Sequence, residues 1–156
     1  MQDFIWWLAA SIHVLAGAAW FGAMAYSLTI VQPRSKRFFA DDDEKFELFV
    51  STIAQGARWK VLGGLGLIAA SGLALIPLSR PHPLASAWTC LIAIKAALLL
   101  IAVILFCRIS WRLWPLRVFA VTSELPAIRR RFLRFAMTMV VIAAVAMMLG
   151  LWAERL

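Results

Sequence analysis

The sequence predicts an all-α, polytopic membrane protein that folds as an antiparallel bundle of four transmembrane helices. Of its 156 residues, 63% are hydrophobic and only 15% are charged, and the mean hydropathy is +0.85. A soluble domain is nearer half apolar and a quarter charged, and a chain this short could not bury so much apolar surface. This composition excludes an ordinary soluble enzyme, a disordered chain and a disulfide scaffold. The whole chain, 1–156, is predicted to be a single transmembrane domain.

Four apolar runs are each about 18 residues or longer, enough for a helix to cross roughly 30 Å of hydrocarbon. They are the predicted spans: 4–31, 61–78, 88–106 and 132–152. The first run lacks the basic segment that precedes a signal peptide's apolar core, so we expect it to be retained.

The net charge of +8 reflects basic residues that lie almost entirely in two connections between the spans. The opposite side of the predicted bundle carries only Arg80 and Arg155. By the positive-inside rule the basic loops face the cytoplasm, where they attract anionic lipids. Both termini are then periplasmic, in a bacterial inner membrane. No basic face is left over for nucleic acid, so no nucleic-acid partner is expected. The basic connections hold Arg34, Lys36, Arg37, Lys45, Arg58 and Lys60, and then Arg108, Arg112, Arg117, Arg129, Arg130 and Arg131, with Arg134 at the entrance of the last span.

Between the first two spans, acidic residues 41–44 precede apolar residues at a spacing of three and four. This pattern predicts an amphipathic cytoplasmic helix at 43–57, whose N-terminal carboxylates cap it and face solvent. The apolar positions include Phe46, Phe49 and Ile53. Pro33 is expected to end or bend the first helix, and Pro126 to lie in the first turn of the last.

Small residues are dense on the second span, where they are expected to let helix backbones approach closely. They are Gly63, Gly64, Gly66, Ala70 and Gly72.

His13 lies within the first span, roughly 14 Å below its outer end. Gly17, Trp20 and Met24 share its helix face at i+4, i+7 and i+11. A histidine in this place is either a packing residue with satisfied hydrogen bonds or part of a site, since ionisable groups in hydrocarbon are costly. The imidazole is therefore a candidate functional group.

Lys95 lies in the third span, roughly 10 Å below Trp88, at a depth similar to that of His13. No span contains a carboxylate that could pair with it. Its ammonium needs a carbonyl, a water or an anionic ligand, such as the propionates of haem or an acidic substrate. The alternative is a structural lysine inside the bundle.

Neutral imidazole is a common ligand of haem iron and of copper, and a thioether suits Cu(I). His13 and Met24 are thus candidate metal ligands, and His13, Lys95 and Trp20 candidate cofactor-binding residues. Haem b and copper both stay open as the cofactor. The other histidine, His82, lies in a short outer loop and is expected to be solvated.

The run from His13 to Met24, followed by Pro33, resembles the first span of CopD-type copper-resistance membrane proteins and of the related HemJ-type protoporphyrinogen oxidases. The run 91–100 around Lys95 resembles their lysine-bearing helix. Gly72 stands where their second span commonly has a glycine, and residues 129–131 precede the last span as in those families. The resemblance implies copper uptake for a CopD-like protein. For a HemJ-like protein it implies haem-dependent protoporphyrinogen oxidation, with a histidine and a lysine that map onto His13 and Lys95.

Three functions follow as hypotheses. The first is a CopD-like inner-membrane protein that handles copper or binds haem at His13 and Lys95. The second is a HemJ-like oxidoreductase. The third is a non-catalytic small subunit that contacts other membrane subunits or a further copy of this chain. Whether the protein is an enzyme is left open.

Overall fold

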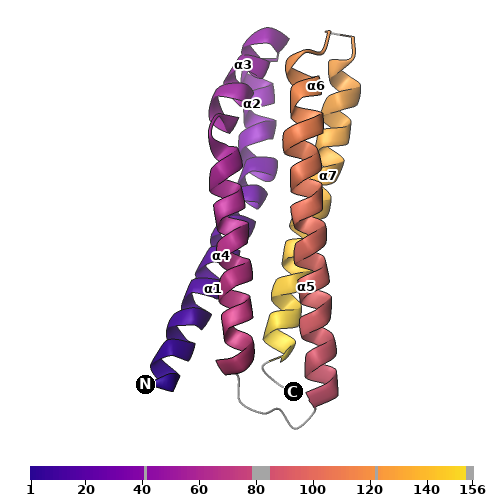
Figure 1. Cartoon of the computed structure of the whole chain (residues 1–156). Helices are drawn as coiled ribbons and strands as arrows, with labels where there is room; N and C mark the ends of the chain where they lie inside the picture. The colour runs from indigo at the N-terminus through magenta and orange to yellow at the C-terminus, as the bar shows by residue number, and fades with distance from the viewer. Residues whose placement is uncertain (41, 79–84, 122, 154–156) are drawn as a thin grey trace.

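The computed structural model describes residues 1–40, 42–78, 85–121 and 123–153, and these form an antiparallel bundle of long helices (Figure 1). There is no strand in these four ranges, so the predicted all-α fold is confirmed. Four helical segments are long and apolar enough to cross a membrane: Gln2–Phe38, Ala57–Leu78, Ser86–Val118 and Leu125–Ala153. Each contains one predicted apolar run.

The bundle is built from two helix pairs (Figure 1). Helix α1 (Gln2–Tyr26) packs mainly along α4 (Ala57–Leu78), and α5 (Ala85–Arg108) packs mainly along α7 (Leu125–Ala153). Contacts between the pairs are fewer and join α1 to α7 and α4 to α5. The two pairs are thus the main packing units of the molecule.

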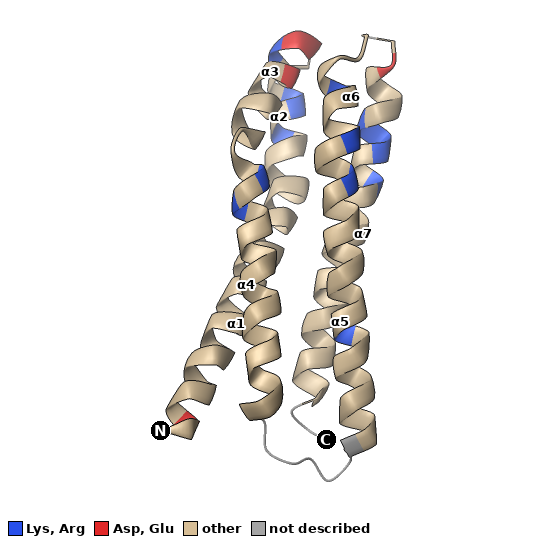
Figure 2. Cartoon of the chain, in the orientation of Figure 1, with Lys and Arg blue, Asp and Glu red and all other residues tan. Residues whose placement is uncertain are grey.

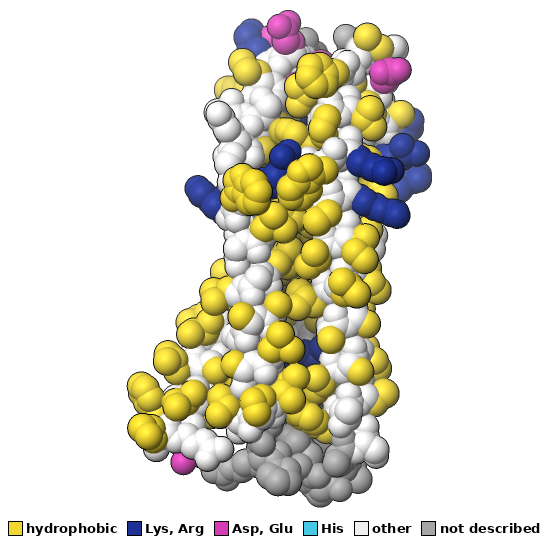
Figure 3. All heavy atoms as spheres, viewed as in Figure 1, with side chains coloured by type: hydrophobic (Ala, Val, Ile, Leu, Met, Phe, Trp, Pro, Cys, Tyr) yellow, Lys and Arg dark blue, Asp and Glu magenta, His cyan; other side chains and the backbone are white. Residues whose placement is uncertain are grey.

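Apolar side chains are spread over the face of the bundle seen in Figure 3, and many large hydrophobic residues are exposed. No residue of α1 is fully buried, and Leu15 and Leu73 are 69% and 67% exposed. Such a surface is unfavourable in water and favourable against lipid. The chain is therefore a multi-pass membrane protein in contact with the bilayer.

Two helices continue through a proline by way of a π-helical turn. The turn η1 (Ser27–Val31) joins α1 to α2 (Gln32–Phe38), and the backbone N–H of Gln32 donates to the carbonyl of Ser27, five residues back. Proline lacks an N–H and its ring crowds the carbonyl four residues before it, and the wider turn accommodates both effects. Of the two effects expected of Pro33, ending the helix does not occur, because the helical segment continues to Phe38.

A second π-helical turn next to a proline occurs in the third span. The turn η2 (Ile109–Leu113) joins α5 to α6 (Trp114–Val118), which has Pro115 as its second residue. As a result this helical segment reaches further beyond its apolar run than expected.

Helix α3 (Asp43–Ala54) is the predicted amphipathic helix. The Asp42 carboxylate caps it by accepting a hydrogen bond from the backbone N–H of Lys45 at 2.9 Å, and Phe46 is buried. Ile53 was expected on the buried face but is 55% exposed. The helix stops at Ala54 rather than 57 because Gly56 adopts φ +74°, a conformation that favours glycine and turns the chain into α4.

Pro126 is the second residue of α7, as predicted. The dense glycines of α4 do not all serve close packing, because a methyl group added to Gly63, Gly64 or Gly66 would meet no atom within 4 Å. The buried interior is formed instead by Leu65, Ala102, Met139 and Ala143.

Lysine and arginine residues gather at one end of the bundle, where α3 contributes acidic residues (Figure 2). Arg80, His82 and Arg155 lie outside the described residues. The charge asymmetry used for the topology prediction is therefore visible at its basic end.

Candidate intramembrane histidine–lysine site

The less exposed face of α1 carries His13, Gly17, Trp20 and Met24, the stripe expected from the sequence. All four are partly buried, whereas Val14 is 63% exposed. The imidazole therefore faces the rest of the bundle.

Helix α4 fixes the orientation of His13. Its Nδ1 lies 3.0 Å from the carbonyl oxygen of Ile68 and 3.1 Å from Oγ of Ser71. A carbonyl can only accept, so Nδ1 must carry the hydrogen. The Ser71 hydroxyl donates to the carbonyl of Leu67 at 2.6 Å and can accept from the same Nδ1–H. In the neutral imidazole the lone pair is then on Nε2.

Gly72 allows this close approach of α1 and α4. A Cβ at position 72 would lie 3.1 Å from Cε1 and 3.4 Å from Nδ1 of His13. The first distance is shorter than ordinary van der Waals contact, so a larger residue would push the imidazole away. The spacing of small residues had placed Gly72 among positions for general packing, whereas in the structure its specific partner is the histidine.

Lys95 belongs to the other helix pair and reaches from α5 to α7. A Cβ added at Gly150 would lie 3.0 Å from the lysine Nζ and 3.8 Å from its Cε. The absent side chain of Gly150 thus leaves the room that the ammonium occupies.

The structure brings His13 and Lys95 close enough for the charge of the lysine to act on the imidazole. One residue comes from the α1–α4 pair and the other from the α5–α7 pair. The charge effect therefore acts between the two helix pairs, and the similar depth of the two residues in the membrane stays a prediction.

Trp20 adds a hydrogen-bond donor to the same face of α1. Its Nε1 is buried and has no hydrogen-bond partner in the described part of the chain. A methyl group on Gly17, which lies between His13 and Trp20 in sequence, would meet no atom within 4 Å. A buried N–H without an acceptor costs free energy, so an acceptor atom of a bound ligand would be favourable at this position.

Met24 does not join His13 at one metal ion. Both lie on the unbroken helix α1, and eleven residues separate them by roughly 16 Å along the axis. One ion cannot bind to both at metal-ligand distances of about 2 Å. In residues 1–40, 42–78, 85–121 and 123–153, no three His, Cys, Asp or Glu side chains form a group that could hold a metal ion.

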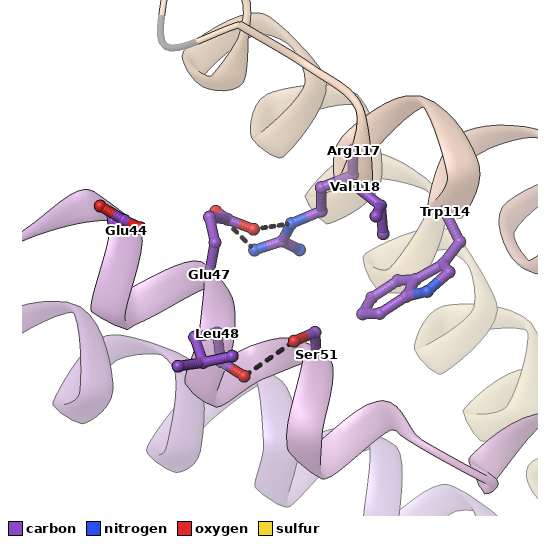
Figure 4. Close-up of a pocket in the computed structure, with 7 residues that line it drawn as sticks. All are labelled: Glu44, Glu47, Leu48, Ser51, Trp114, Arg117 and Val118. Atoms are coloured by element: carbon purple, nitrogen blue, oxygen red, sulfur yellow. Dashed lines mark hydrogen bonds and ion pairs between the residues drawn. The ribbon is translucent and has the colours of Figure 1, made fainter.

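At the basic end, the structure contains an ion-pair cluster that sequence reasoning missed, and Figure 4 shows its Glu47–Arg117 pair. Glu47 of α3 accepts from Nε of Arg117 at 2.7 Å and from Nε of Arg129 at 2.8 Å. Arg129 also pairs with Asp43 at 2.8 Å. The Arg117 side chain is only 5% exposed and its guanidinium lies over the ring of Phe132 at 5.3 Å.

This cluster changes the interpretation of the acidic run. Asp42 is a cap, as predicted, but Asp43 is not simply solvated, because it holds an arginine of α7. Burial alone would raise the pKa of Glu47, but the hydrogen bonds and charges of Arg117 and Arg129 outweigh it and hold the pKa below its usual range. The four-residue spacing of Asp43 and Glu47 was the available signal, since it puts both carboxylates on one helix face.

Comparison of the chain with protein-family models, with curated proteins and with solved structures finds no match.

Proposed function

We propose that this protein binds haem within the membrane through Nε2 of His13. The observation that supports this most is the hydrogen bond from Nδ1 to the Ile68 carbonyl. Histidines that ligate a metal usually donate their other ring N–H to a carbonyl or carboxylate, which fixes the tautomer and orients the ring. His13 has this arrangement.

The surroundings of His13 suit haem better than a copper ion. A single imidazole is sufficient as a haem axial ligand, whereas Cu(I) would need further soft ligands beside it and Met24 is too far along the helix. Trp20 Nε1 and the Lys95 ammonium provide a donor and a positive charge for the carboxylates of a tetrapyrrole. Bound haem would supply a redox-active iron. The carbonyl of Ile68 orients the imidazole, and Lys95 and Trp20 would bind the anionic groups of the haem.

This proposal includes either a CopD-like haem protein or a HemJ-like oxidoreductase that acts on an anionic tetrapyrrole. The two share the site and differ in substrate. Copper handling at a separate position near Met24, and a non-catalytic role in a larger membrane complex or a homo-oligomer, are the competing functions.

The experiment is an absorption spectrum and metal analysis of the protein purified in detergent. We expect a Soret band in the wild type that is lost in His13→Ala but kept in His82→Ala, the matched control for the other histidine. Lys95→Met should weaken haem retention more than Lys95→Arg, which keeps the charge. Bound copper without a Soret band would support copper handling instead, and a wild type with neither would contradict the haem proposal.

We further propose that the basic end of the bundle faces the cytoplasm of a bacterial inner membrane and that both termini are periplasmic. The support is the positive-inside asymmetry of the arginines and lysines. On this placement, anionic lipids of the cytoplasmic leaflet surround the basic end.

A further inference from the structure

Five arginines at the basic end belong to neighbouring parts of the bundle. Arg108 and Arg112 lie at the end of α5 and in η2, and Arg130, Arg131 and Arg134 lie in the first turns of α7. Both α5 and η2 contact α7. Dark blue side chains gather accordingly on the α5–α7 side of the space-filling view (Figure 3). We refer to these five residues as the arginine face.

The arginine face is not used for internal ion pairs. All five side chains are exposed, and in the described ranges none of them pairs with a carboxylate. Of the acids at this end, Glu47 and Asp43 bind Arg117 and Arg129, and neither Glu44 nor Glu124 forms an ion pair with any of the five arginines. Within the described ranges, the five guanidinium groups therefore have no carboxylate partner.

Directly along the same helices, towards the middle of the membrane, the exposed residues become aliphatic. Ile104, which lies one helix turn from Arg108, is 46% exposed. Met137 lies one turn from Arg134 and is 47% exposed, and Val141, one turn further, is 57% exposed. The α5–α7 side thus has guanidinium groups at its end and an apolar surface below them. This order matches a phospholipid, with its phosphate at the interface and its acyl chains in the hydrocarbon.

The composition of the face indicates the headgroup. Every basic side chain in residues 96–156 is an arginine and none is a lysine. The guanidinium plane binds phosphate oxygens through two parallel hydrogen bonds. A headgroup with two phosphates can engage arginines of both helices at once, and the second contact is then intramolecular and gains in effective concentration. A lipid with one phosphate does not have this advantage.

We propose that the arginine face is a binding site for a membrane lipid that carries two phosphates, of the diphosphatidylglycerol class, seated across α5 and α7. The site is separate from His13 and does not depend on haem. It is more specific than a general attraction of basic loops to anionic lipid, because it assigns one side of the bundle and one class of headgroup.

The test is native mass spectrometry of the detergent-purified protein titrated with defined lipids. The wild type should bind diphosphatidylglycerol at least tenfold more tightly than phosphatidylglycerol. The triple variant Arg108→Gln/Arg112→Gln/Arg134→Gln should lose about tenfold or more of that affinity. Its matched control, Arg34→Gln/Lys36→Gln/Arg37→Gln, removes the same charge from exposed positions of α2 and should retain it.

An equal loss in both triple variants would mean general electrostatic attraction and would overturn the proposal. Equal binding of the two lipids by the wild type would do the same. Competition by inorganic pyrophosphate as strong as that of the lipid would assign the site to a soluble anion instead. Circular dichroism of both variants checks that they are folded, and the spectrum of the haem region should be the same in all three proteins.

Discussion

At the scale of single residues, the candidate site depends on two glycines that give space to two polar side chains. Gly72 allows His13 to reach α4, and Gly150 allows Lys95 to reach α7. In a lipid environment helices approach each other where side chains are small. Here the room so created is occupied by an imidazole on one side and an ammonium on the other.

Gly72→Ala should weaken haem retention by about tenfold, because the added methyl group would crowd the imidazole and overpacking costs about 1–3 kcal/mol. The measurement is the ratio of Soret to protein absorbance during titration with haem. Gly63→Ala is the matched control on the same helix, since a methyl group there meets no atom within 4 Å. If the two variants retain haem equally, Gly72 does not position His13.

The sequence identified His13, Lys95 and Trp20 as chemistry-bearing residues because each is out of place in an apolar span. It did not identify Ser71, although a hydroxyl residue next to Gly72 in an apolar run was a signal of the same kind. Nor could it indicate that the partner of His13 is the carbonyl of Ile68, since every residue has a carbonyl and only the packing of α1 on α4 selects one.

At the scale of elements, α3 connects the two helix pairs at the basic end. It lies in sequence between α2 and α4, yet its carboxylates bind arginines of α6 and α7. Arg58 at the start of α4 adds a second connection, donating to the carbonyl of Ser110 at 2.8 Å and lying 4.8 Å from the ring of Trp111. We infer that this end holds the two pairs together.

Glu47→Ala should destabilise the protein by about 3 kcal/mol, because removal of one partner leaves the buried Arg117 guanidinium uncompensated. This corresponds to a fall in Tm of roughly 6–12 °C for a chain of this size. Thermal unfolding in detergent measures it. Glu44→Ala, at an exposed position of the same helix, should change Tm little, and a comparable fall there would argue against the ion-pair cluster.

The same cluster should make stability depend on pH. Because the pKa of Glu47 is lower in the folded protein than its ordinary value of 4.5, its stabilising contribution is complete above that value. It is lost as the pH falls through the lowered pKa. The Tm of the wild type should therefore fall more steeply with acidification than the Tm of Glu47→Gln. Parallel curves of Tm against pH for the two proteins would exclude this role of Glu47.

At the scale of the whole molecule, the asymmetry of charge should decide the orientation in the membrane. In a background of Cys90→Ser and Cys107→Ser, a cysteine at Gln2 should react with a membrane-impermeant maleimide in spheroplasts. A cysteine at Ser123, at the basic end, should react only after the membrane is permeabilised. The reverse pattern would place the termini in the cytoplasm.

Hydropathy and charge order were sufficient for the all-α membrane fold, the four spans and the face of α1 that carries His13. These are local properties, set by the length of apolar runs and by the 3.6-residue period of a helix. The ends of the helices were harder to predict, because π-helical turns let the helix continue past Pro33 and Pro115 without a break.

Only the tertiary structure decided which groups meet. The bond from His13 to α4, the position of Lys95 against Gly150, and the pairing of Glu47 with Arg117 and Arg129 all join residues at least 55 positions apart in the chain. Such contacts depend on which helix faces pack together. Because the helices are apolar on nearly every face, the sequence pattern alone does not show which face of one helix packs against which face of another. The residue types thus specified a membrane bundle with a histidine and a lysine in it, and packing decided that the histidine binds α4 and that the lysine lies against Gly150 of α7.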